Sequence, residues 1–259
     1  MRLRSDVVSS FTIIKGAMID ETYAAFAAWD LSSSKRENLD RLRRENLIGA
    51  TSTQWLRDVA KVLNRRFEPD GRDRALVLLA NRGCAIEEWK PILLWHMTRD
   101  EFLLRNFLET WLFPLYETSA LRVRPDGLYQ YLRNIGNQGG TTEHVWSEAT
   151  LKRVATSLLR IAADFGLLRG SAVKEFTSYH LPEYSFLYLL HAIKEERVSP
   201  GKVISAPDWR MFLMRPADVE HELLRLHQFH KIDYQVAGSL VQLTLPFATS
   251  REFVEKMVA

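Results

Sequence analysis

The sequence predicts a mainly α-helical protein, with a multi-helix N-terminal bundle and a C-terminal α+β part that ends in a β-hairpin. Apolar residues recur at helical spacing through most of the 259 residues. Capping and turn-forming residues separate these apolar stretches from one another. The spacing changes to two only near residues 230–246, where alternating residues on both sides of Gly238 are typical of a hairpin.

The first 140 residues predict a series of helices after a β-branched run, residues 9–15, that we expect to be extended. Helices are expected over residues 18–29, 35–47, 51–66, 72–80, 84–97, 98–112 and 128–135. Ser52 or Thr51 can cap the third of these, in which Trp55, Val59, Val62 and Leu63 form the apolar stripe. Thr98 and Glu101 match the capping-box pattern, which predicts that they open the helix over 98–112.

The clearest single element is the helix predicted between Thr141 and Gly170. Ser147 can cap its N-terminus, and Gly166 suits a left-handed C-cap. One side is apolar and consists of Leu151, Val154, Ala155, Leu158, Ile161, Ala162 and Phe165. The other side carries Arg153, Thr156, Ser157, Arg160 and Asp164. This polar side is either an ordinary solvated face or a nucleic-acid-facing one, because arginines and hydroxyls suit phosphate contacts.

A domain boundary is expected near residue 170, giving a helical domain over 1–170 and a second domain over 171–259. In the second domain, helices over 184–196, 207–214 and 216–229 precede the hairpin, residues 199–201 form a turn, and Thr249 and Glu252 cap a closing helix. This order is that of a winged helix, and also of many small α+β packings. The helix before the hairpin holds Asp218, Glu220 and Glu222 against Arg225, so its face suits a protein partner at least as well as DNA.

Charge is distributed unevenly along the chain. The net charge of +3 is too small to create a strong field over the whole molecule. Residues 35–74, however, hold 11 Lys and Arg against 7 Asp and Glu, so the net positive charge of this segment is larger than that of the whole chain. Such a segment forms either a solvated helical face laced with ion pairs or a basic face for nucleic acid.

The sequence lacks the motifs of several enzyme classes. It has no Gly-rich phosphate loop, no H-E-x-x-H and no G-x-S-x-G. His221, His227 and His230 lie close together, but no thiolate or carboxylate at ligand spacing accompanies them, so no metal or cofactor is expected. The single cysteine, Cys84, fits a small core residue and a reducing compartment. No apolar run approaches the roughly 20 residues of a membrane span, so a cytoplasmic location is expected.

Four stretches together resemble one protein family. They are FTIIKGAMIDETYAAFAAW, NLIGATSTQWLRDVAKVLNRRF, RDEFLLRNFLETWLFPLY and WSEATLKRVATSLLRIAADFGLLRG. In their order and spacing over residues 10–170 they resemble the BrxA component of BREX bacteriophage-defence systems. The resemblance implies a non-enzymatic, largely helical protein with a NusB-like fold, encoded beside a methyltransferase, an AAA+ ATPase and a PglZ-type protein. DNA binding is also implied, whereas an older description of the family as an inner-membrane protein conflicts with the short apolar runs.

The DNA-binding role implied by the resemblance leads to a set of candidate contacts, chosen by charge and helical face. They are Arg41, Arg43, Arg44, Arg65, Arg66, Lys152, Arg153 and Arg160. The expected partners are duplex DNA, bound with little sequence preference, and other BREX proteins. Two alternatives stay open: a pure protein-interaction module without DNA contact, and an enzyme whose site is assembled from distant residues. The sequence gives no indication of oligomeric state.

Overall fold

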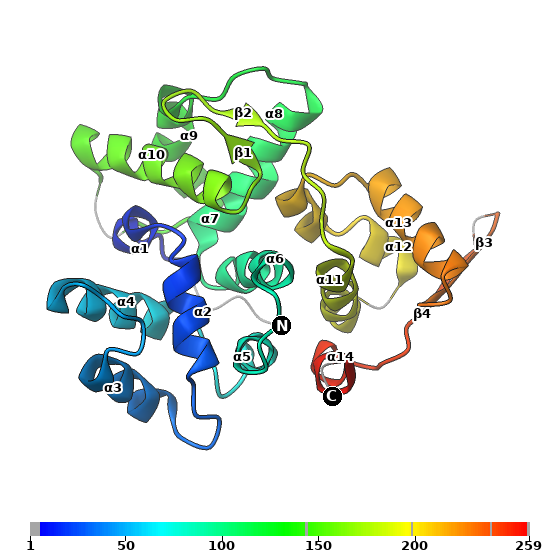
Figure 1. Cartoon of the computed structure of the whole chain (residues 1–259). Helices are drawn as coiled ribbons and strands as arrows, with labels where there is room; N and C mark the ends of the chain where they lie inside the picture. The colour runs from blue at the N-terminus through cyan, green and yellow to red at the C-terminus, as the bar shows by residue number, and fades with distance from the viewer. Residues whose placement is uncertain (1–5, 143–144, 198, 239, 258–259) are drawn as a thin grey trace.

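The computed structural model describes residues 6–142, 145–197, 199–238 and 240–257, and within them it confirms a mainly α-helical fold with a C-terminal hairpin (Figure 1). The N-terminal helices are α1 (Ser10–Lys15), α2 (Ile19–Ala27), α3 (Lys35–Glu45), α4 (Thr53–Arg66), α5 (Arg74–Asn81) and α6 (Ile86–Met97). A continuous helical segment follows, made of α7 (Phe102–Asn106), the π-helical η1 (Phe107–Leu112) and α8 (Phe113–Glu117). The 3-10 helices η2 (Pro125–Leu128) and η3 (Ile135–Gln138) flank α9 (Tyr129–Arg133).

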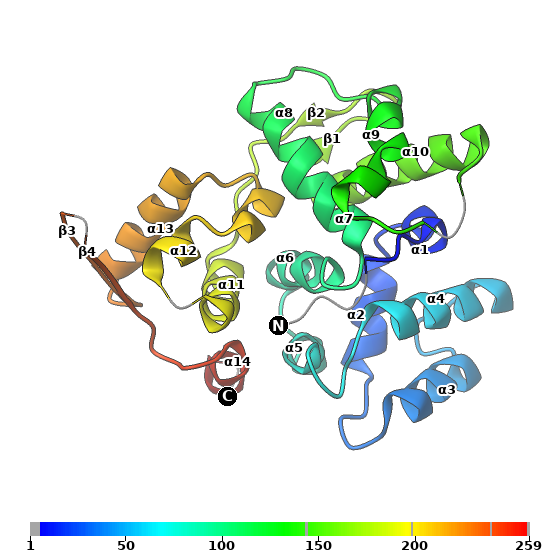
Figure 2. The same cartoon turned by 180° about the vertical axis from the view of Figure 1, so that it is seen from behind.

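The second half begins with the long helix α10 (Glu148–Asp164) and the short antiparallel pair β1 (Leu168–Arg169) and β2 (Glu175–Phe176). The predicted domain boundary near residue 170 falls in the loop between these strands. The remaining elements are α11 (Glu183–Glu196), α12 (Pro200–Ile204), η4 (Pro207–Phe212), α13 (Pro216–Gln228), β3 (Asp233–Ala237), β4 (Leu240–Thr244) and α14 (Ser250–Met257). Seen from behind in Figure 2, the β3–β4 hairpin extends outward at the edge of the molecule.

Serine caps begin several helices, as the local sequence predicts. The hydroxyl of Ser52 accepts the Trp55 N–H at 3.1 Å, and that of Ser147 accepts the Thr150 N–H at 3.2 Å. Ser34 and Glu37 form a complete capping box at the start of α3. Gly166 takes the left-handed conformation, with φ +81°, just after α10, which confirms the predicted C-cap.

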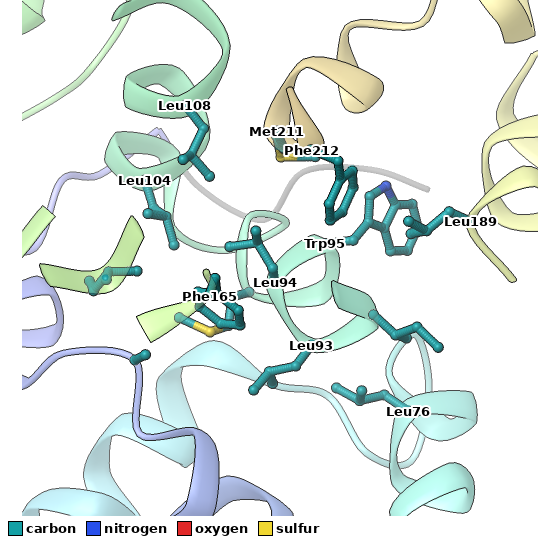
Figure 3. Close-up of a cluster of buried hydrophobic side chains, with 14 of the residues drawn as sticks. Leu76, Leu93, Leu94, Trp95, Leu104, Leu108, Phe165, Leu189, Met211 and Phe212 are labelled. Carbon is teal, nitrogen blue, oxygen red and sulfur yellow. The ribbon is translucent and has the colours of Figure 1, made fainter. Parts of the chain in front are cut away.

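Helix α6 lies at the centre of the core. Its residues from Pro91 to Met97 are all buried, which is typical of a helix that other elements surround on every side. Figure 3 shows Leu93, Leu94 and Trp95 of α6 among apolar side chains from both halves of the chain. These neighbours include Leu76 of α5, Leu104 of α7, Leu189 of α11 and Phe212 of η4.

The C-terminal part packs directly on the N-terminal helices. Helix α11 contacts α6, and α14 contacts α5. In the hairpin, β3 and β4 pair over five residues, with Gln235 opposite Gln242. The observed order of helices and hairpin agrees with the predicted order, and its likeness to a winged helix stays a prediction. No helix in the described ranges has the length and apolar character needed to cross a bilayer.

Three local predictions are wrong. Residues 9–15 are helical rather than extended, because Ser9 caps a turn whose Thr12 and Ile13 side chains are buried. Thr98 and Glu101 do not form a capping box. The Thr98 hydroxyl donates to the Trp95 carbonyl at the end of α6, and the Glu101 carboxylate accepts a hydrogen bond from Arg66, which is distant in sequence. Residues 199–201 do not form an isolated turn, because Pro200 occupies the first position of α12.

Candidate nucleic-acid interface

The short helix α1 lies between α4 and α10, two helices that are far apart in sequence. Arg160 of α10 donates to the Ile14 carbonyl of α1 at 3.3 Å. On the other side, Lys15 of α1 forms a 2.5 Å ion pair with Asp58 of α4. Figure 1 shows α10, α1, α4 and α3 following one another down one side of the molecule. Helix α1 therefore joins α10 to α4 and holds their exposed faces close together.

Basic side chains border α1 on both sides, and we call them together the α1–α4–α10 surface. Its members are Lys15, Arg57, Lys61, Arg65, Lys152, Arg153 and Arg160. Four of its members, Arg57, Lys61, Lys152 and Arg153, form no ion pair with any described residue, so their charges are available to a ligand.

The α4 side of this surface consists of residues spaced by four. Arg57, Lys61 and Arg65 therefore lie on one face of the helix. Arg57 and Lys61 are exposed, and the Lys61 ammonium lies 4.5 Å from the centroid of the Phe11 ring in α1. Arg65 is half-buried and donates to the Val7 carbonyl at 3.2 Å, just ahead of α1.

The α10 side carries Lys152, Arg153 and Arg160, all exposed. Arg153 and Arg160 are seven residues apart, so they lie on the same face about 10 Å from each other along the axis. Thr156 lies between them with its hydroxyl donating to the Lys152 carbonyl. Ser157, which the sequence places on the polar side, is buried and does not belong to the exposed face.

Arg66 was predicted as a DNA contact, and the structure contradicts this. Its side chain is fully buried, and its Nε donates to Glu101 Oε1 at 3.1 Å. Nη1 donates to the Ala17 carbonyl at 3.2 Å, and Nη2 donates to the carbonyls of Thr12 at 2.8 Å and Gly16 at 3.0 Å. A guanidinium with these partners and no exposed surface holds the N-terminal segment in place and cannot reach a phosphate.

Helical spacing in the sequence was enough to place Arg66 on the buried side of α4 and so to distinguish it from Arg65. The buried stripe of α4 runs through Val59, Val62 and Leu63, and Arg66 lies four residues after Val62 and three after Leu63. Its position therefore belongs to the buried side, even though its residue type favours the surface. A charged residue at such a position predicts a buried partner, which proves to be Glu101.

The three predicted arginines of α3 lie beyond α4, outside the α1–α4–α10 surface. Arg41 is half-buried and donates to the Ala28 carbonyl. Arg43 pairs with Asp40 at 2.9 Å, and Arg44 pairs with Glu45 at 2.9 Å. Both pairs are exposed, so they contribute little to stability and could exchange for phosphates at the edge of the surface.

Sequence reasoning missed three members of the surface, Lys15, Arg57 and Lys61. Arg57 and Lys61 lie on the same face as Arg65, so helical spacing would have indicated them. Lys15 belongs to a segment that the sequence predicted to be extended, and its role depends on the pairing with Asp58. Nothing in the local sequence indicates that contact.

The buried pair His96 and Asp73 is an arrangement that resembles a catalytic dyad. The ring Nδ1 lies 2.6 Å from the Asp73 carboxylate, and Nε2 lies 2.7 Å from the Tyr188 hydroxyl. Burial lowers the pKa of His96, which favours the neutral ring. Both ring nitrogens are occupied, so this imidazole has no nitrogen left for a substrate even though it lines a cleft of about 350 Å³.

No group of three or more His, Cys, Asp or Glu side chains in the described part of the chain is placed to hold a metal ion. The three histidines considered from the sequence do not converge. His227 accepts the Tyr234 N–H at 3.2 Å and supports the start of the hairpin, and His221 lines a cleft on the other side of α13.

Comparison with known proteins gives one family finding. A family model described as BrxA matches residues 10–192, which is more than half of the chain. No curated protein matches the chain.

Proposed function

The chain belongs to the BrxA family, and on this premise we propose that it is a non-enzymatic component of a BREX-type phage-defence system that binds duplex DNA. The proposed contact is the α1–α4–α10 surface. Recognition would depend on phosphates and would show little preference for base sequence.

One observation carries the proposal: α1 brings two rows of basic side chains, from α4 and α10, to the same side of the molecule. Lysine and arginine that are exposed and without carboxylate partners suit phosphate oxygens. Helices α4 and α10 carry three carboxylates, and two of them have partners: Asp58 pairs with Lys15, and Glu148 pairs with Arg133. Asp164 is exposed at the C-terminal end of α10, and its negative charge marks the end of the basic surface on that helix.

The composition of the surface favours binding without base readout. Readout of base edges commonly uses Asn, Gln or Arg presented from an element that enters a groove. Here the cations project from the sides of two helices separated by a third, a geometry that suits the sugar-phosphate backbone. Binding of this kind releases counterions and weakens steeply as salt increases.

The test is a gel-shift titration against random-sequence duplex at about 50 and about 200 mM salt, the range over which phosphate contacts lose most of their affinity. Charge reversal at two exposed members, Lys61→Glu and Arg153→Glu, should weaken binding and reduce the slope of log K against log salt by about one per lost contact. Lys202→Glu is the matched control, because Lys202 is exposed on α12 and the change in net charge is identical.

Equal losses in all three variants would mean that net charge, and not this surface, determines binding. Failure of the wild-type protein to bind duplex at low salt would eliminate direct DNA recognition.

The second candidate function is a scaffold that contacts proteins only. It is supported by α13, whose exposed carboxylates Asp218 and Glu220 repel phosphate. The scaffold hypothesis predicts no DNA retention and copurification with a protein encoded beside this one.

A further inference from the structure

A cleft of about 430 Å³ lies between α8, the segment over residues 177–182 and α13, away from the α1–α4–α10 surface. Aromatic rings form much of its wall: Tyr116, Tyr179, Phe186 and Phe212. Polar groups enter from α13 and from the segment before α11, and they are Asp218, His221, Glu222, Arg225 and His180. Concave sites with apolar walls and a few convergent polar groups are the usual form of a ligand site.

We propose that this cleft binds an organic cation with a guanidinium or ammonium head, either the side chain of an arginine in a partner protein or a small free amine. The inference goes beyond the proposed DNA binding and does not depend on it.

The charges around the cleft favour a cation. Arg225 donates to Glu222 at 2.5 Å and to Glu183 at 2.8 Å, and Lys231 also pairs with Glu183. These two cations and two carboxylates compensate one another. The Asp218 carboxylate remains, and it forms no ion pair with any residue in the described ranges; Arg215 on the rim contacts the Tyr116 ring and does not pair with Asp218.

The unused hydrogen-bonding capacity also fits a donor-only ligand. No hydrogen bond joins the Tyr179 hydroxyl or the His221 ring to another side chain or backbone group of the described residues. Both groups can accept an N–H, as can the carboxylate of Asp218. A guanidinium offers five donors and no acceptor, so it matches acceptors of this kind.

The aromatic wall already attracts a guanidinium within the chain. The Arg215 Cζ lies 5.8 Å from the centroid of the Tyr116 ring, on the rim beside the cleft. Contacts of this type are attractive, and more so when water is excluded. A cation bound deeper, between the Tyr116 and Tyr179 walls, would gain the same attraction together with the charge of Asp218.

The experiment compares three probes by NMR titration of the full chain: N-acetyl-arginine amide, its uncharged isostere N-acetyl-citrulline amide, and the peptide Gly-Gly-Arg-Gly-Gly. The arginine amide should bind at least about tenfold more tightly than the citrulline amide, a difference of about 1.4 kcal/mol. A peptide that binds more tightly than the amide assigns the cleft to a protein side chain, and equal affinities assign it to a small cation.

Two variants locate the binding. Asp218→Asn should abolish the preference for arginine over citrulline, and it keeps a side-chain oxygen that can accept the Arg215 N–H and preserve the start of α13. Glu220→Gln removes one charge from the exposed face of the same helix outside the cleft, and it should leave the preference intact. Equal binding of arginine and citrulline amides, or equal effects of the two variants, would overturn the proposal.

Discussion

Replacing Arg66 by methionine should destabilise the protein strongly, because the substitution removes one partner of a fully buried ion pair. Among the described residues, the Glu101 carboxylate, 2% exposed, would keep only the Thr12 hydroxyl at 3.0 Å as a hydrogen-bond donor from a side chain. The carbonyls of Thr12, Gly16 and Ala17 would lose the donors that Arg66 supplies.

The expected loss follows from this geometry. Removing one member of a buried pair costs about 3–5 kcal/mol, because the remaining charge stays buried without compensation. For a chain of this size about 1 kcal/mol lowers Tm by about 2 °C, so the loss should appear as a decrease of roughly 6–10 °C.

Thermal unfolding and urea titration measure the effect, and three further variants identify its cause. Arg57→Met removes an exposed arginine from the same helix and should change stability by less than about 0.5 kcal/mol. Arg66→Lys should cause most of the loss expected for Arg66→Met, since one ammonium cannot reach a carboxylate and three carbonyls. In the double variant Arg66→Met with Glu101→Gln, part of the loss should be recovered, because the uncompensated charge is gone.

A wild-type Tm for Arg66→Met, accompanied by a loss of DNA affinity, would refute the reasoning. That result would mean that the guanidinium is at the surface and contacts the nucleic acid directly.

Two further predictions concern charges near the junction of the two halves. Burial raises the pKa of Glu109 to about 7, with Asp208 acting in the same direction against nearby arginines. Because the folded-state pKa lies above the unfolded value, the folded protein holds a proton that the unfolded chain releases. Stability contributed by this group is therefore lost as pH rises from about 4.5 through about 7. Glu109→Gln should stabilise the protein by up to about 3 kcal/mol at pH values near 8 and very little near pH 4, measured by urea unfolding at both; equal effects at the two pH values would contradict the assignment. Asp208 accepts hydrogen bonds from Arg99 at 2.5 Å, Arg197 at 2.8 Å and Trp95 Nε1 at 3.0 Å. Asp208→Asn should cost about 3–5 kcal/mol, because it leaves the charge of Arg99, 5% exposed, buried without a carboxylate partner. Asp233→Asn on the exposed hairpin is its control, and a similar loss in both variants would count against a special role for the buried carboxylate.

The helices that local signals define were predicted well. The serine caps at Ser52 and Ser147 act within three residues, and the apolar stripe of α4 is visible in the spacing alone. The hairpin was predicted from its change of period around Gly238. These features depend on neighbours in sequence, which is why the sequence alone sufficed.

The errors come from residues whose partners are distant in sequence. Glu101 satisfies a capping pattern with Thr98, but its carboxylate is engaged by Arg66, 35 residues away. The segment over 9–15 has β-branched residues that disfavour helix only weakly, and its burial against α4 and α10 outweighs this preference. The cleft beside Tyr116 could not be predicted, since it is assembled from four separate parts of the chain.

The same long-range contacts explain which cations serve the fold and which are available for a ligand. A helix of six residues is too short to be stable alone, and its last carbonyls have no partner within the helix. Arg66 and Arg160 donate to the carbonyls of Thr12 and Ile14, and their positive charge also suits the C-terminal end of the helix dipole. Part of the charge that resembles a nucleic-acid footprint therefore holds α1 in place.

The DNA-binding proposal consequently depends on the cations of the surface whose side chains form no ion pair or hydrogen bond with the described residues, namely Arg57, Lys61, Lys152 and Arg153. The two groups can be separated by mutation, because they act on different quantities. Substitution in the first group removes hydrogen bonds to α1 and should lower the free energy of unfolding. Substitution in the second group leaves the folded contacts unchanged, so it should lower DNA affinity at constant stability. A surface that bound DNA through its structural arginines would lose both properties together, and the variants at Lys61 and Arg66 distinguish these two cases.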